Sequence, residues 1–188
     1  MAYNEQLGPD QDNGVSALVN VLFVCLGNIC RSPMAEAVFR RKVREAGLEE
    51  RIAVDSAGTS GWHAGEPPHY GTRKVLERHG IGYEGIVSRK VNRQDFQRFQ
   101  YIVAMDSDNL EALRAMAEGS PAGRNEARLV RFLELLPDCG LTDVPDPYYT
   151  GNFDQVYDLI DRGCDALLAW IVQHEGLKRE DGGSARES

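Results

Sequence analysis

Apolar and polar residues follow one another in blocks that predict alternating strands and helices. Leu18–Cys25 (LVNVLFVC) is a short, β-branched apolar run, which is typical of a buried parallel strand. A helical pattern follows from Met34 to Glu45, with Pro33 at the predicted first helical position, where its missing N–H has no intrahelical partner. A longer helix is predicted to begin at Phe153, because apolar residues recur every three or four positions on one face: Phe153, Val156, Tyr157, Ile160, Cys164, Leu167, Leu168 and Ile171.

Shorter segments continue this alternation between the two ends. The pattern predicts strands at Ile52–Ser56, Tyr101–Ala104 and Arg128–Phe132, and helices at Thr72–His79, Asn92–Phe99 and 107–117. Strand and helix therefore alternate four times, which indicates an α/β fold with a parallel sheet and helices on both faces. Ligands of such sheets bind beyond the carboxyl ends of the strands, so the loop after the first strand is the first candidate site.

The chain ends differ from the middle in composition. Both are polar and lack periodicity, so we expect a flexible N-terminal extension (1–16), one domain (17–175) and a flexible C-terminal tail (176–188). A length of 188 residues suits a single domain. The longest apolar stretch, Ala17–Leu26, is about half the length that a membrane-spanning helix needs, and no basic residue precedes it. We expect a cytoplasmic protein without membrane insertion.

Charge and cysteine content exclude several classes of function. The formal net charge of −8 argues against nucleic-acid binding, so an anionic substrate must be held by a local positive site. The four cysteines (Cys25, Cys30, Cys139 and Cys164) form no C-x-x-C pair and no Cys/His zinc pattern, so no structural zinc site is expected. In a reducing compartment these thiols are free, which leaves one of them available for catalysis.

The loop after the first strand carries a C-x5-R-S motif from Cys25 to Ser32. Backbone N–H groups that curl toward a helix N-terminus form a cradle for an anion, and Gly27 and Asn28 tolerate the left-handed conformations that such a cradle needs. Arg31 offers a planar fork for two phosphoryl oxygens. Cys25 at the bottom of the cradle is expected to be a thiolate nucleophile, with Ser32 donating a hydrogen bond to its sulfur.

A second segment supplies a candidate acid. Asp146 lies between Pro145 and Pro147, which stiffen its loop, and it is followed by Tyr148 and Tyr149. A carboxyl group here can protonate the oxygen of a leaving group and later deprotonate water. The two tyrosines can form a slot for an aryl phosphate. Taken alone, Cys25 is also compatible with an inert buried thiol, and the Asp-Pro pair with a simple turn.

With these motifs identified, the chain closely resembles the low-molecular-weight protein tyrosine phosphatases. The resemblance runs from about Asn20 to Ile171 and includes VLFVCLGNICRSPMAEAVF (21–39), VDSAGTSGW (54–62), RHGI (78–81), YIVAMDSDNL (101–110) and DPYYTGNFDQVYDLI (146–160). It implies a four-stranded parallel sheet with a phosphate-binding loop between the first strand and helix. It also implies hydrolysis of phosphotyrosine and small aryl phosphates through a cysteinyl-phosphate, without cofactor or metal. Phosphotyrosine-containing proteins are the implied partners, and phosphate-like oxyanions the implied inhibitors.

The resemblance also implies a role for each site residue. Cys25 is the implied nucleophile, Arg31 the phosphate clamp and Asp146 the acid and then the base. Backbone N–H groups that bind phosphate are implied for Leu26, Gly27, Asn28, Ile29 and Cys30, continuing into Arg31 and Ser32. The implied hydrogen-bond network under the loop consists of Asn28, Ser32, Ser56 and His79, with Glu36 beside it. The implied aromatic rim is Trp62, Tyr148 and Tyr149.

The remaining cysteines and histidines lead to weaker expectations. Cys25 and Cys30 are separated by four residues on one curled loop, so Cys30 is either a reversible redox partner of Cys25 or a packing residue. The resemblance favours redox pairing. His63, His69 and His174 have no ligand spacing, and we expect them to be solvated.

Three other functions remain open from the sequence. A thioredoxin-coupled arsenate reductase of the same fold needs further cysteines near the nucleophile, but the remaining thiols lie far downstream. A related phosphoarginine phosphatase carries a threonine in place of Ile29, whose apolar side chain fits an aryl ring better. A phosphopeptide-binding module without catalysis is expected to lack the nucleophile or the acid, and both are present.

Overall fold

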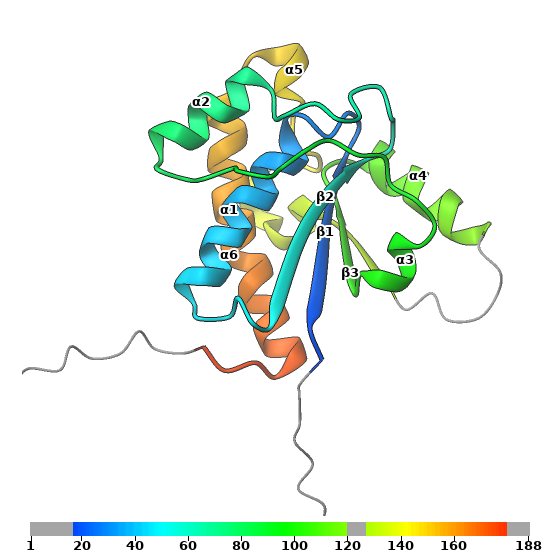
Figure 1. The fold of residues 1–188 in the computed structure, drawn as a ribbon, viewed down its shortest axis with the longest axis vertical. Coiled ribbons are helices and arrows are strands. Elements are labelled where there is room, and N and C mark those ends of the chain that lie inside the picture. The colour runs from blue at the N-terminus through cyan, green and yellow to red at the C-terminus, as the bar shows by residue number, and fades with distance from the viewer. Residues whose placement is uncertain (1–16, 120–126, 180–188) are drawn as a thin grey trace, which may run out of the picture.

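A four-stranded parallel sheet forms the centre of the molecule (Figure 1). The computed structural model describes residues 17–119 and 127–179. The strands are β1 (Val19–Cys25), β2 (Ile52–Gly58), β3 (Tyr101–Ala104) and β4 (Arg128–Arg131), and they lie in the order β2-β1-β3-β4 with every neighbouring pair parallel. The predicted fold class is thereby confirmed. The predicted extension (1–16) and most of the predicted tail (180–188) lie outside the described residues.

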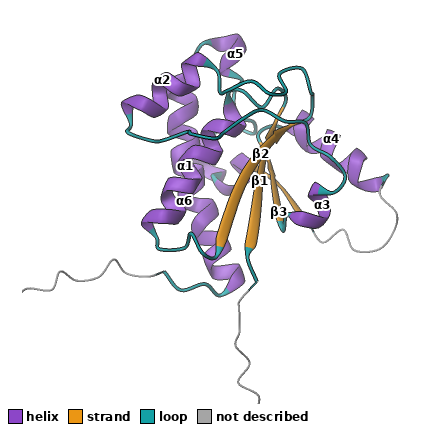
Figure 2. Cartoon of the chain, in the orientation of Figure 1, coloured by secondary structure: helices purple, strands orange, loops and turns teal. Residues whose placement is uncertain are grey.

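Helices cover both faces of the sheet (Figure 2). On one face lie α1 (Arg31–Glu45) and α6 (Phe153–Glu175), and on the other α3 (Asp95–Arg98) and α4 (Ser107–Glu118). Successive residues of β1 alternate between two buried clusters, one with α1 and α6 and one with α3 and α4. Both faces of β1 are therefore buried, which explains its nearly continuous apolar sequence.

Short elements near the carboxyl edge of the sheet complete the fold. They are α2 (Tyr70–Arg78), α5 (Pro147–Thr150) and the 3₁₀ turns Phe132–Leu135 and Pro137–Cys139. Only α2 was predicted, because one-turn helices leave no apolar periodicity in a sequence. In the described part of the chain, no helix has both the length and the apolar character that crossing a bilayer requires.

The first helix begins earlier than predicted. It starts at Arg31, so Pro33 is the third helical residue and not the first. This position is tolerated because the first intrahelical bond in the helix is donated by the next residue, Met34, to the carbonyl of Cys30 at 3.3 Å. No side chain caps this N-terminus, so its backbone N–H groups are open toward the end of β1.

Other boundaries also differ from the prediction. The predicted helix Asn92–Phe99 shrinks to the four residues of α3, because the side chain of Asn92 accepts hydrogen bonds from the N–H groups of Gln94 and Asp95 and forms a capped turn instead. At the C-terminus, Leu177 was placed in the flexible tail, but it is buried in the core and its N–H bonds to the carbonyl of Val172.

The sheet topology places the end of β1 at a crossover point. The chain passes from β1 to β2 on one side and then returns to β3 on the other side. At such a point the connections leave the sheet in opposite directions, and the carboxyl ends of β1 and β3 border an open crevice. Cys25 is the last residue of β1, so the candidate nucleophile lies at this crevice.

Close packing of α6 against the sheet produces a stability prediction. A Cβ added to Gly163 would lie 2.3 Å from the ring of Phe132, which is fully buried and touches Phe23 edge-on. We expect Gly163→Ala to lower the free energy of unfolding by about 1–3 kcal/mol, although alanine favours helix by about 1 kcal/mol. Urea unfolding measures the change. Ala169→Gly, at an exposed position of α6, calibrates the propensity effect, and a stabilised Gly163→Ala variant would contradict the packing argument.

Candidate active site

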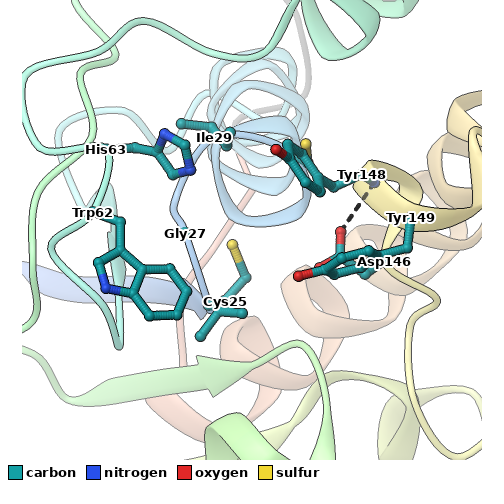
Figure 3. A pocket seen from close by; sticks show the side chains of 10 residues that line it. Cys25, Gly27, Ile29, Trp62, His63, Asp146, Tyr148 and Tyr149 are labelled. Atoms are coloured by element: carbon teal, nitrogen blue, oxygen red, sulfur yellow. Dashed lines mark hydrogen bonds between the residues drawn. The ribbon is translucent and has the colours of Figure 1, made fainter.

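A cavity of about 230 Å³ opens at the crevice and brings three distant segments together (Figure 3). Its lining residues come from the loop after β1, from the loop after β2 and from the start of α5: Cys25, Leu26, Gly27, Ile29, Cys30, Trp62, His63, Asp146, Tyr148 and Tyr149. Asp146 and both tyrosines lie across the cavity from Trp62 and His63. The structure therefore brings into one cavity the residues that the sequence predicted as nucleophile, acid and aromatic rim.

Asn28 determines the shape of the phosphate loop. Its φ of 55° is left-handed, and it is the one non-glycine residue in the described chain with a positive φ. Three hydrogen bonds hold its side chain: Nδ2 donates to Ser32 Oγ (2.8 Å) and Ser56 Oγ (3.0 Å), and Oδ1 accepts from the backbone N–H of Arg89 (2.9 Å). The backbone conformation costs about 1 kcal/mol or more, which these buried bonds offset.

The hydrogen bonds that Asn28 donates continue on two sides of the loop, toward Cys25 and toward Glu36. Because Ser32 Oγ accepts from Asn28, its own hydrogen has two acceptors within reach, Cys25 Sγ at 3.0 Å and the carbonyl of Ala57 at 3.4 Å. On the other side, Ser56 Oγ accepts from Asn28 and donates to Glu36 Oε2 at 2.6 Å. A thiolate at Cys25 would be the nearer and the charged acceptor of the two, so it would draw the hydroxyl hydrogen of Ser32 and be stabilised by it.

Glu36 anchors the far end of this network. It is 3% exposed, and burial raises its pKa to about 7, although the hydrogen bond from Ser56 and the charge of Arg40 oppose the shift. Arg40, one turn further along α1, forms an ion pair with the other carboxylate oxygen. The loop is thus supported by a buried acid that titrates near neutral pH.

Arg31 is held in place by its two terminal nitrogens, while its Nε has no described partner. Its Nη1 donates to Asp106 Oδ2 (2.7 Å) and to the carbonyl of Val144 (3.0 Å), and its Nη2 lies 3.3 Å from Asp146 Oδ2. Burial opposes the charge, but Cys25, Asp106 and Asp146 outweigh it and raise the pKa of the guanidinium. The buried Nε has no partner in the described structure, so it is available to an anion.

Asp146 lies where an acid is needed. It is the N-cap of α5, with Oδ1 accepting from the N–H of Tyr148 at 3.1 Å, and its side chain is 24% exposed. Its carboxyl group faces Cys25 across the cavity (Figure 3).

Sequence reasoning missed several residues that support the loop. Asp106 follows β3 and caps α4. The rule that sites lie at the carboxyl ends of strands could have identified it from the sequence. Ser88 donates to the carbonyl of Gly27 (3.1 Å), and Thr72 donates to the carbonyl of Cys30 (3.1 Å). Arg89 also bridges two acids, Asp55 and the fully buried Asp95. No motif marks these last three residues.

His79 is not brought to the loop, so its predicted place in the network is wrong. It is the exposed C-cap residue of α2, and its ring stacks on Tyr157 with centroids 3.8 Å apart. Its carbonyl accepts from Arg41. The RHGI motif instead ends α2, because Gly80 takes a positive φ of 64° there.

Two histidines expected to be solvated have defined places near the site. His63 lines the cavity. His69 caps α2 by accepting from the N–H of Gly71 (3.0 Å), stacks on Phe153 and touches the ring of Tyr148 edge-on.

No group of three or more His, Cys, Asp or Glu side chains in the described chain is arranged to hold a metal ion. All four cysteines are unpaired. Burial, followed by the charges of Cys25 and Asp146, raises the pKa of Cys30 to about 12, so Cys30 is a thiol beside the nucleophile.

Comparisons with known proteins agree with this geometry. The family model described as "Low molecular weight phosphotyrosine protein phosphatase" matches residues 20–181. The low molecular weight protein-tyrosine-phosphatase YfkJ of Bacillus subtilis is 51% identical over 160 residues, which are 85% of this chain and 100% of YfkJ. PtpA of Staphylococcus aureus, which carries the same description, is 43% identical over 161 residues, which are 86% of this chain and 99% of PtpA.

Solved structures show the same fold. The crystal structure of YfkJ superposes with a TM-score of 0.80 at 50% identity and covers 86% of this chain and 99% of YfkJ. The structure of DARP, a Drosophila arginine phosphatase, superposes with a TM-score of 0.75 at 33% identity and covers 80% of this chain and 96% of DARP.

The raised pKa of Glu36 predicts a pH dependence of stability. The folded value of about 7 lies above the ordinary 4.5, so folding favours the protonated carboxyl. The stability that Glu36 contributes is therefore fully present below pH 4.5 and is lost as the pH rises through 7. As the pH rises from 4.5 through 7, we expect the free energy of unfolding of Glu36→Gln, measured with urea, to rise by about 3 kcal/mol relative to that of wild type. Glu45→Gln, on the exposed end of α1, is the control. Parallel profiles for wild type and Glu36→Gln would disprove the assignment.

Proposed function

The chain belongs to the low-molecular-weight phosphotyrosine protein phosphatase family, and we propose that it hydrolyses phosphotyrosine in proteins through the three groups around its cavity. Family membership makes it a protein tyrosine phosphatase that acts through a cysteinyl-phosphate. The observation that supports the assignment of residues is their arrangement: the sulfur of Cys25, the free Nε of Arg31 and the carboxyl of Asp146 surround one space.

In the first step, phosphate moves from the substrate to the enzyme. The phosphoryl group lies in the loop between Cys25 and Arg31, where backbone N–H groups and the open N-terminus of α1 receive its oxygens. The sulfur forms a bond to phosphorus while the bond from phosphorus to the leaving oxygen breaks. Asp146 donates its proton to that oxygen, so tyrosine leaves as a neutral phenol.

In the second step, water releases the phosphate. Asp146, now a carboxylate, takes a proton from water, and the water oxygen bonds to phosphorus as the sulfur–phosphorus bond breaks. Cys25 departs as a thiolate, which accepts the hydrogen bond from Ser32. Inorganic phosphate is the product, and similar oxyanions are expected to bind the same loop and inhibit the enzyme.

The walls of the cavity favour an aryl substrate. Ile29 is apolar, and Trp62, Tyr148 and Tyr149 are exposed by 75%, 54% and 74%, so large aromatic surfaces are available for a tyrosine ring. An arginine phosphatase shares the fold, so phosphoarginine is the second candidate. The apolar side chain of Ile29 offers no acceptor to the N–H groups of a phosphoarginine guanidinium. Turnover of phosphotyrosine and phosphoarginine peptides at equal concentration distinguishes the two.

Two further expectations follow from the cysteines. A thioredoxin-coupled arsenate reductase needs a relay of further thiols after the nucleophile, but Cys30 is the one cysteine besides Cys25 that lines the cavity. Cys164 is fully buried beneath α1, where its thiol faces the carbonyl of Ala35.

The four unpaired thiols are typical of a reducing compartment, which supports a cytoplasmic location.

The role of Asp146 is tested by changing the leaving group. We expect Asp146→Ala to lower kcat by about 10²–10⁴-fold for phenyl phosphate, whose leaving oxygen needs a proton, and far less for para-nitrophenyl phosphate. Steady-state kinetics on both substrates measure this difference. Asp154→Ala, an exposed acid at the start of α6, is the matched control, and Cys25→Ser gives the inactive baseline. Equal losses on both substrates would place Asp146 outside the chemistry.

We also propose that Cys30 protects Cys25 from oxidation. Peroxide converts the Cys25 thiolate to a sulfenic acid and releases hydroxide; the Cys30 sulfur then attacks, forming a disulfide while water leaves. Burial and the charge of Cys25 raise the pKa of Cys30, and oxidation of Cys25 to a neutral acid removes the second cause.

The redox proposal predicts a difference in recovery. After peroxide treatment, wild type should regain activity with dithiothreitol, whereas Cys30→Ser should recover only a small part, and peptide mapping should find the Cys25–Cys30 bridge in wild type. Cys139→Ser is the control, because Cys139 lies outside the cavity. Equal recovery of wild type and Cys30→Ser without a bridged peptide would show that Cys30 is a packing residue.

A further inference from the structure

A carboxylate three residues before Asp146 anchors the loop that carries the acid. Asp143 Oδ1 accepts two hydrogen bonds from Ser107, one from its backbone N–H (2.8 Å) and one from its hydroxyl (2.7 Å). Ser107 is the first residue of α4, where the helix dipole favours a carboxylate. Arg131 donates to the same hydroxyl oxygen at 3.0 Å, and Asp143 is the acceptor described for the hydroxyl hydrogen. The two bonds between Ser107 and Asp143 are called the latch below.

Little else fixes the start of this loop. Among the described residues, no backbone N–H or C=O group of 140–143 takes part in a backbone–backbone hydrogen bond. The next residue, Val144, is buried, and its N–H bonds to the carbonyl of Met105 (3.0 Å). Asp143 itself is exposed, so burial does not hold it. Its side chain is therefore what ties this part of the loop to α4.

The position of Asp143 is passed on to Asp146 through a stiff segment. Pro145 fixes its own φ and restricts Val144 to an extended backbone. Few free rotations therefore separate Asp143 from Asp146. A movement at Asp143 displaces the carboxyl of Asp146, which faces Cys25 across the cavity (Figure 3).

The same turn of α4 also holds the phosphate clamp. Asp106, the N-cap of the helix, accepts from Arg31 Nη1 at 2.7 Å. The carbonyl of Val144 accepts from the same nitrogen at 3.0 Å. Two adjacent residues, Asp106 and Ser107, thus hold the clamp and the acid loop against one helix end. The clamp and the acid are thereby placed relative to each other.

We propose that Ser107 and Asp143 are positioning residues for the general acid. Neither of them lines the cavity, so each acts through Asp146 and not on the substrate. Without the latch, Asp146 is less often within reach of the leaving oxygen. This slows the transfer of the proton and leaves the attack of Cys25 on phosphorus unchanged. The inference rests on the proposed role of Asp146 as the acid.

Substrates that differ in their leaving group separate positioning of the acid from a general structural role. The values of kcat/KM are measured for phenyl phosphate, whose leaving oxygen needs a proton, and for para-nitrophenyl phosphate, whose leaving oxygen needs little help. We expect Asp143→Ala to lower kcat/KM about tenfold for phenyl phosphate and less than about twofold for para-nitrophenyl phosphate. Damage to the fold or to the phosphate loop would instead lower both values alike.

Three further variants identify the hydrogen bonds responsible. Asp143→Asn should keep most of the wild-type kcat/KM on phenyl phosphate, because an amide oxygen can accept both bonds from Ser107. Ser107→Ala loses the hydroxyl but keeps the N–H, so its loss should be smaller, and it should add nothing to the loss in Asp143→Ala. Asp138→Ala changes another exposed acid of the same connection and is the matched control, expected to match wild type on both substrates.

Several results would overturn the positioning role. One is wild-type kcat/KM of Asp143→Ala on both substrates, and another is an equal loss on both. A third is an Asp143→Asn variant as impaired as Asp143→Ala, which would mean that the charge acts and not the hydrogen bonds. Asp146→Ala, measured alongside, distinguishes the two proposals. If it loses equally on both substrates, the proposed role of the acid is refuted and the latch with it, whereas a selective loss there without one in Asp143→Ala refutes the latch alone.

Discussion

The left-handed backbone of Asn28 is the constraint on which the site depends. A loop that must aim consecutive N–H groups at one anion cannot follow an ordinary turn, and a non-glycine residue adopts this conformation only when its surroundings enforce it. Ser32, Ser56 and the backbone of Arg89 supply that enforcement, and each belongs to a different part of the chain. The loop is therefore correct only after α1, β2 and the segment before α3 have docked.

The same network explains why buried charges are placed behind the loop. A negative protein that binds a dianion needs a strong local cation, and Arg31 provides it, with Asp106 and Asp146 as counter-charges. Glu36 closes the network from the other side, at the cost of a carboxyl whose pKa rises with burial. A second buried ion pair lies beside the loop, where the carboxylate of Asp95 is paired with Arg89. Arg89 also donates its backbone N–H to the side chain of Asn28.

Much of this architecture was predictable, and the failures have physical causes. β1 and β3 were identified because burial on both faces makes a strand continuously apolar, and α6 because burial of one face imposes a helical period on its apolar residues. The motif at Cys25 identified the loop because few residue types satisfy its chemistry. Arg89 was missed because its contacts come from tertiary packing, which leaves no local pattern. His79 was misassigned because a motif was carried over by position, whereas its ring packs on Tyr157.

The hydrogen bonds that hold the Arg31 side chain also affect how tightly substrate binds. A long side chain that is free in solution gives up about 2 kcal/mol of rotamer entropy when it is immobilised. Asp106 and the carbonyl of Val144 hold Nη1 in the empty enzyme, so this entropy is lost when the chain folds and not when phosphate arrives. At about 1.4 kcal/mol for each factor of ten, the fixed guanidinium contributes roughly thirtyfold to the affinity for a phosphoryl group. The free Nε thus belongs to a receptor that is organised before its ligand binds.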